Sequence, residues 1–294
     1  VMLFCMVFML YPRASISAKR IMAVLNTETS IENHPGNAQT DSGSGEHSVI
    51  FEHVDFVYPD GEEAVLKDIS FSAKSGETVA FIGSTGSGKS SLIQLIPRFY
   101  DRASGNIYID GQKIEDLDIN ALRSKIGFVP QKAHLFSGTI EENIRFGKPD
   151  ATMDEIIHAA KIAQAYDFIM EKPHQFQEQI VEGATNVSGG QKQRLSIARA
   201  LIRKPEIYIY DDSFSALDFK TDARLRKALK PEIKNAIVFL VAQRVSTILD
   251  ADKIVVLDEG KIAGIGTHRE LLTSCPIYYE IAASQLSKEE LTYA

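Results

Sequence analysis

The chain has 294 residues, of which 44% are hydrophobic and 24% charged, and its formal net charge at pH 7 is −7. This composition is typical of a globular protein with one large domain or two small ones. Acidic and basic residues are interspersed without a Lys/Arg block, which argues against a nucleic-acid partner. Cys5 and Cys275 are too far apart in sequence for a disulfide framework or a zinc site, which indicates a reducing compartment.

The chain starts with an apolar run, VMLFCMVFMLY, which Pro12 and Arg13 follow. The run is shorter than the roughly 20 residues that a membrane-spanning helix needs. Its positive charge comes after the apolar stretch, unlike that of a secretory signal peptide. A buried core helix and the cytoplasmic end of a membrane helix both remain open. We favour the membrane helix, because a polar helical stretch continues through residues 12–26.

The rest of the chain reads as a linker followed by a compact domain. Residues 28–48 are polar and rich in Ser, Gly, Asn and Thr, which predicts a linker. Residues 78–82, TVAFI, are apolar on both faces, as expected for a central parallel strand. The periodicity of apolar residues predicts further strands at 49–58, 65–74, 105–111, 206–210, 236–242 and 253–260. It also predicts a helix that starts at Lys89 and ends near Pro97, and helices at 150–171, 191–202 and 221–233. This alternation predicts a three-layer α/β core.

A phosphate-binding motif lies between the apolar strand and the helix after it. It has the form G-x-x-x-x-G-K-S and comprises Gly83, Ser84, Thr85, Gly86, Ser87, Gly88, Lys89 and Ser90, followed by Ser91. Glycines let backbone N–H groups turn toward phosphate oxygens, and the helix adds its positive N-terminal end. In such a loop the lysine reaches the β- and γ-phosphates and the serine hydroxyl binds Mg²⁺. A simple Gly/Ser turn is the alternative, but the flanking strand and helix favour nucleotide binding.

A pair of carboxylates, Asp211 and Asp212, ends the apolar run EIYIY. In a P-loop ATPase the aspartate at such a strand end holds Mg²⁺, usually through water. Asp211 is therefore predicted to be a metal ligand together with Ser90, and ATP and Mg²⁺ are the expected cofactors. A solvated turn is the alternative for two adjacent acids, and the P-loop in the same chain argues against it.

Further motifs indicate which class of P-loop ATPase this chain resembles. They are Tyr58 in FVYP, Gln131 in FVPQ, NVSGGQKQR at 186–194 and SALD at 215–218. In this order and spacing they resemble the nucleotide-binding domain of ABC transporters, over about residues 49–285. The resemblance implies a P-loop NTPase (RecA-like) core with an antiparallel β subdomain and an α-helical signature subdomain. Residues 286–294 are then a C-terminal tail.

Three segments resemble ABC exporters in particular: 15–26, 133–147 and VEG at 181–183. By this resemblance residues 1–27 are the cytoplasmic end of the last transmembrane helix and its extension. The chain is then a half-transporter without most of its membrane domain, at the cytoplasmic face of the cell membrane. Its expected partners are transmembrane domains and a second half-transporter, with no nucleic acid.

The resemblance also implies roles for single residues. Tyr58 would stack on adenine, the loop from Gly83 to Ser91 would hold the phosphates, and Gln131 would bind Mg²⁺ and sense the membrane domain. The signature would contact the γ-phosphate of ATP on a partner cassette through Ser188, Gly189, Gly190 and Gln191. Asp218 would lie at the seam between the two cassettes.

Two positions depart from the family pattern. The residue after the Mg²⁺ aspartate is usually Glu, which polarises the attacking water. Here it is Asp212, whose carboxylate retreats by about 1.5 Å; a misplacement of about 1 Å can cost on the order of 100-fold in rate. Gln243 replaces the family's switch histidine and cannot carry charge toward the γ-phosphate. Both changes predict a site that binds ATP and cleaves it poorly, beside an intact signature.

Four interpretations stay open. The first is one subunit of a heterodimeric exporter, whose competent site combines the partner's P-loop with this signature. The second is a homodimeric exporter with slow hydrolysis, and the third is an ATP-gated regulator without hydrolysis. The fourth, a soluble ABC ATPase acting on nucleic acid or ribosomes, is disfavoured by the single uninterrupted cassette and the apolar stub. The transported substrate is not encoded here, because its contacts lie in the membrane domain.

Overall fold

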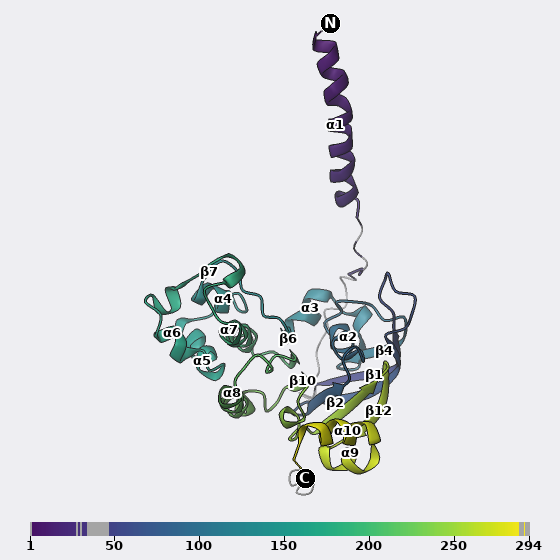
Figure 1. Ribbon diagram of the computed structural model, residues 1–294, viewed down its shortest axis with the longest axis vertical. Helices are drawn as coiled ribbons and strands as arrows, with labels where there is room; N and C mark the ends of the chain where they lie inside the picture. Colours follow the sequence, from purple (N-terminus) through teal and green to yellow (C-terminus); the bar gives the residue numbers. More distant parts are fainter. Residues whose placement is uncertain (1, 28, 30, 34–46, 288–290, 292–294) are drawn as a thin grey trace. The chain divides into compact units, whose positions relative to one another are not determined.

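The computed structural model describes residues 2–27, 29, 31–33, 47–287 and 291. It contains two compact units, residues 1–33 and residues 34–294. The main element of the first unit is helix α1, Met2–Leu25 (Figure 1). It includes Pro12, and apolar side chains such as Phe8 are exposed. Within the described ranges, every helix is too short or too polar to cross a membrane. Most of the predicted linker lies outside the described residues, and the first strand begins at Ser48.

A six-stranded sheet forms the core of the second unit, in the order β12-β11-β3-β10-β9-β6. Its strands are β3 Thr78–Gly83, β6 Ile126–Val129, β9 Ile207–Asp211, β10 Ile237–Val241, β11 Lys253–Asp258 and β12 Lys261–Gly266. All neighbours pair in parallel except β12, which is antiparallel to β11. Val241 pairs with both Phe81 and Asp211, so the carboxyl ends of β3, β10 and β9 meet at one edge. Such an edge is where open α/β sheets bind ligands.

A second, antiparallel sheet packs against this core. Its order is β2-β1-β4-β5, with β1 Ser48–Phe56, β2 Leu66–Lys74, β4 Ser104–Ile109 and β5 Gln112–Lys113. Val79 and Phe81 of β3 face the apolar cluster shared with this sheet, whereas Ala80 and Ile82 face the cluster on the other side. The strand is therefore apolar on both faces, as its sequence predicts. A short pair, β7 Gly138–Thr139 and β8 Gln179–Ile180, completes the strands of the described chain.

The helices of the second unit fall into two groups. α2 Lys89–Leu95 and α3 Ile119–Ser124 pack on the cluster between the two sheets. The others are α4 Ile140–Arg145, α5 Met153–Ile162, α6 Tyr166–Met170, α7 Gly189–Leu201, α8 Phe219–Glu232, α9 His268–Ser274 and α10 Pro276–Gln285. α4 to α7 gather on one side of the unit, as the predicted α-helical subdomain (Figure 1). The P-loop NTPase fold with its two subdomains is thus confirmed.

The predicted helix at 150–171 is wrong in its continuity. It is two helices, α5 and α6, because Gln164 has a left-handed backbone with φ 56° and interrupts the hydrogen-bond ladder. The helix starts only at Met153, where Thr152 and Glu155 form a capping box. The helix predicted to start at Lys89 and end near Pro97 spans Lys89–Leu95, in agreement with that prediction.

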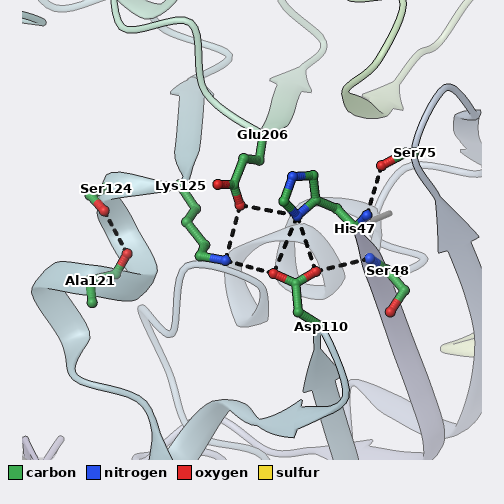
Figure 2. A network of polar contacts seen from close by, with 8 residues as sticks. All are labelled: His47, Ser48, Ser75, Asp110, Ala121, Ser124, Lys125 and Glu206. Carbon is green, nitrogen blue, oxygen red and sulfur yellow. Dashed lines mark hydrogen bonds and ion pairs between the residues drawn. The ribbon is translucent and has the colours of Figure 1, made fainter. Parts of the chain in front are cut away.

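An ion-pair cluster joins the two sheets at the amino ends of β6 and β9 (Figure 2). Lys125 Nζ lies 2.6 Å from an Asp110 oxygen and 3.0 Å from Glu206 Oε2, and His47 Nδ1 lies 3.3 Å from both carboxylates. Burial opposes the charge on Lys125, but the two carboxylates outweigh it and raise the pKa of the ammonium. The lysine is therefore the cation of this cluster, which ties the start of the domain to its core.

Candidate nucleotide site

The phosphate loop joins β3 to α2 and needs two of its glycines for steric reasons. A Cβ on Gly83, at φ 153°, would lie 2.0 Å from the Leu257 carbonyl oxygen. A Cβ on Gly88, at φ 96°, would lie 2.6 Å from Leu66 Cδ2. The tip of the loop, at Gly86, has nothing within 4 Å of such an atom. The loop is thus pressed against the core at its ends and open where phosphates would enter.

Lys89 folds back over this loop. Its Nζ donates to the Gly83 carbonyl at 2.9 Å, to the Ser84 carbonyl at 2.7 Å and to Ser87 Oγ at 3.3 Å. Burial lowers the pKa of the ammonium, and the charges of Asp212 and Asp211 partly offset that effect. None of the three acceptors is charged, so the ammonium remains suited to an anion in the loop.

The carboxylate of Asp211 meets the first turn of α2. Ser90 Oγ donates to Asp211 Oδ1 at 2.8 Å, and Asp211 is only 5% exposed. Burial raises the pKa of Asp211, the Ser90 hydrogen bond opposes this, and the charge of Asp212 adds to it. A buried carboxylate beside a hydroxyl is a hard oxygen pair that a divalent cation would stabilise, so the residues fit Mg²⁺.

Asp212 is held from two sides. Its Oδ2 accepts from Gln243 Nε2 at 2.6 Å and from Gln131 Nε2 at 3.2 Å, so both amides donate to the same oxygen. Its backbone has φ 46°, and its N–H donates to the Val241 carbonyl at 3.0 Å. Asp212 is 6% exposed. The three side chains therefore form one hydrogen-bonded group at the ends of β6, β9 and β10.

These groups surround one cavity of about 730 Å³. Of the residues predicted from sequence, it is lined by Gly83, Ser84, Thr85, Gly86, Gly88, Lys89, Ser90, Ser91, Gln131, Asp211, Asp212 and Gln243. The other lining residues were not predicted from the sequence. They are Val65, Ile82, Val241 and Asp258, with Ile277, Glu280, Ile281, Ser284 and Gln285 of α10. No local motif marks α10; its apolar periodicity at Ile277 and Ile281 indicates only a packed helix.

Tyr58 lies beside the cavity rather than in its lining. Its hydroxyl is 2.9 Å from Ser91 Oγ, and its ring packs edge-on against Phe56 and Tyr100, with centroids 4.7 and 5.1 Å away. Ser87, the one residue of the predicted loop that does not line the cavity, is buried. Stacking of Tyr58 on adenine stays a prediction.

The signature forms the N-terminus of α7, away from this cavity. Ser188 caps the helix: its Oγ accepts from the Gln191 N–H at 3.2 Å, and its own N–H donates to Gln191 Oε1 at 3.0 Å. Ser188 and Gly189 are exposed. A Cβ on Gly190 would lie 3.2 Å from the Ala216 carbonyl oxygen. The start of α7 offers backbone N–H groups to an anion. It is not part of the cavity beside this chain's own phosphate loop.

The fold and the site together define a P-loop nucleotide-binding protein with a separate helical signature subdomain. The family model described as ABC transporter matches residues 66–215. The chain belongs to the ABC transporter family and constitutes an ATP-binding domain of it.

Relatives in this family include proteins of several bacteria. An uncharacterized ABC transporter ATP-binding protein of Bacillus subtilis is 45% identical over 287 residues, covering 98% of this chain and 49% of that protein. A putative multidrug export ATP-binding/permease protein of Staphylococcus aureus is 48% identical over 237 residues, covering 81% of this chain and 41% of that protein. The chain thus spans about half the length of these relatives.

A solved structure extends the likeness to the whole fold. The structure of a bacterial Atm1-family ABC exporter with ATP bound superposes with a TM-score of 0.87 at 34% identity, covering 96% of this chain and 49% of that one. The exporter subfamily predicted from the sequence therefore agrees with the relatives and with this neighbour.

Proposed function

We propose that this chain is the ATP-binding part of an ABC exporter half-transporter whose own nucleotide site binds Mg·ATP but hydrolyses it slowly. The observation that carries the proposal is the state of Asp212. Two amide groups donate to one oxygen of its carboxylate, and neither Gln131 nor Gln243 can act as an acid. One carboxylate oxygen is therefore already occupied by amide donors, and the side chain is also shorter than the usual glutamate, so it is poorly placed to accept a proton from water.

The remaining residues of the cavity supply binding. Lys89 and the N–H groups of the loop would hold the phosphates, while Ser90, Asp211 and Gln131 would hold Mg²⁺. When bound, Mg²⁺ neutralises charge on the phosphates. Tyr58 would pack on the adenine from beside the cavity. Binding of Mg·ATP is thus supported by an arrangement in which only Asp212 and Gln243 depart from the family pattern.

The signature extends the proposal to a partner. Ser188 and Gly189 are exposed at a helix N-terminus, which suits the γ-phosphate of a nucleotide held by a second cassette. We assign that cassette to a second half-transporter with a competent site, and Asp218 to the seam between them. Membrane domains would place the assembly at the cytoplasmic face of the cell membrane, in keeping with the export function in the name of the Staphylococcus aureus relative. A homodimer with two slow sites is the alternative.

Nucleotide titration tests the binding half of the proposal. Lys89→Ala removes three hydrogen bonds within the loop and the ammonium itself, and should weaken Mg·ATP binding at least about 100-fold, since charge-assisted contacts are worth about 1.5–3 kcal/mol each. Lys113→Ala, an exposed lysine outside the cavity, is the matched control and should bind like wild type. Equal affinity in both variants would refute the site.

A further inference from the structure

The side chain of Gln285, at the end of α10, bridges to the segment that follows β10. Its Nε2 donates to the Gln243 carbonyl at 3.0 Å, and its Oε1 accepts from the Val245 N–H at 2.8 Å. One amide thus binds the backbone on both sides of Arg244. Because donor and acceptor are both engaged, the amide has a single orientation and holds residues 243–245 in one position.

Helix α10, which carries Gln285, is anchored in the core by buried residues. Tyr278 of α10 is fully buried, and its hydroxyl lies 2.7 Å from Nδ1 of the buried His268. Ala282, one turn before the end of the helix, is also fully buried in the main apolar cluster. Gln285 itself is exposed. The side chain therefore extends from an anchored helix while contributing little packing of its own.

The bridge reaches the altered base of the nucleotide site through Gln243. Gln285 holds the backbone carbonyl of Gln243, and the side chain of Gln243 donates to Asp212 Oδ2 at 2.6 Å. Val245, on the other side of the bridge, is fully buried and begins a short 3-10 turn. The position of the Gln243 amide is thus set from α10 and not by β10 alone.

We infer that Gln285 is a positioning residue for ATP hydrolysis in this cavity, acting through Gln243 on Asp212. The inference rests on the proposed function, since it requires nucleotide in the cavity. α10 also lines that cavity. One helix would therefore contact the bound nucleotide and hold residues 243–245. Gln285 makes its contacts with the backbone at Gln243 and Val245, and its role is to place the Gln243 amide against Asp212.

Gln285→Met tests the bridge, because methionine keeps the length of the side chain and removes both polar groups. Single-turnover hydrolysis by the 294-residue chain should accelerate about 3- to 10-fold, the effect expected for one ordinary hydrogen bond, because a displaced Gln243 amide no longer holds the Asp212 oxygen. The Kd for Mg·ATP should change less than about twofold, since Lys89 and the loop are untouched. Exchange of the Val245 amide hydrogen should accelerate by a similar factor. Tyr279→Ala, an exposed residue of the same helix, is the control.

Coupling separates positioning from a general effect on the fold. In a Gln243→Ala background, Gln285→Met should change the hydrolysis rate by less than about twofold, because the amide that Gln285 places is gone. A wild-type rate and wild-type amide exchange in Gln285→Met, or a full additional gain in the double variant, would overturn the role of Gln285 while ATP binding stays normal. Failure of wild-type chain to bind Mg·ATP would instead overturn the proposed function together with this inference.

Discussion

Replacing Asp212 by Glu and Gln243 by His should accelerate ATP hydrolysis at this site if, as proposed, the wild-type site is slow. The added methylene advances the carboxylate by about 1.5 Å, and misplacement by about 1 Å can cost on the order of 100-fold. The second change removes the amide that donates to Asp212 Oδ2 at 2.6 Å. A hydrogen bond to a charged group is worth about 1.5–3 kcal/mol, or roughly 10- to 100-fold in rate. Because both residues act on one transition state, we expect about 100- to 1,000-fold together rather than the full product.

The assay is single-turnover hydrolysis of ATP by an excess of chain, at concentrations high enough for two copies to pair through their signatures. Each single variant is measured beside the double variant, and adding Lys89→Ala to the double variant should return the rate to background. ATP affinity should stay within about threefold of wild type throughout. A double variant that binds ATP but hydrolyses it no faster than wild type would refute the reasoning about Asp212.

Two further predictions concern the signature and the metal ligand. Gly190→Trp should lower the ATPase rate of the transporter assembled with a competent partner at least about 10-fold, because even a Cβ there would lie 3.2 Å from the Ala216 carbonyl oxygen. ATP binding to the chain's own phosphate loop should persist. An unchanged ATPase rate would show that this signature does not serve the competent site. Burial raises the pKa of Asp211 above 3.8, so its Mg²⁺-binding form is present above the raised pKa and is lost as pH falls through it. Mg²⁺ titration at a series of pH values should therefore show tenfold weaker binding per unit below that pKa, and an identical profile in Asp211→Asn would contradict the assignment.

The parts of the site that could be predicted from the sequence are those whose residues lie next to one another in the chain. The loop from Gly83 to Ser90 is local in sequence, and its strand and helix follow from apolar periodicity on either side. Asp211 could be predicted because a charged residue ends a buried strand, and parallel strands bring such ends together. The expectation that Asp212 and Gln243 share one nucleotide rested on family resemblance, and their direct hydrogen bond could not be read from spacing.

The parts that sequence reasoning missed depend on contacts between distant segments or on single backbone angles. Gln285 reaches Gln243 across 42 positions, and nothing local in α10 marks its polar contacts. The break at Gln164 needs a left-handed residue that carries no glycine signal. β12 was not predicted, because Gly264 and Gly266 weaken its strand pattern.

Hydrolysis of ATP held by the wild-type phosphate loop tests the central claim most directly. ATP is bound to the chain, the competent partner site is blocked by substitution of its water-activating glutamate, and the decay of bound ATP is followed in the assembled pair. The account predicts cleavage at least about 100-fold slower than at the competent site, from the misplaced carboxylate alone. Cleavage at a comparable rate would show that Asp212 activates water adequately, and would contradict the claim in favour of two working sites.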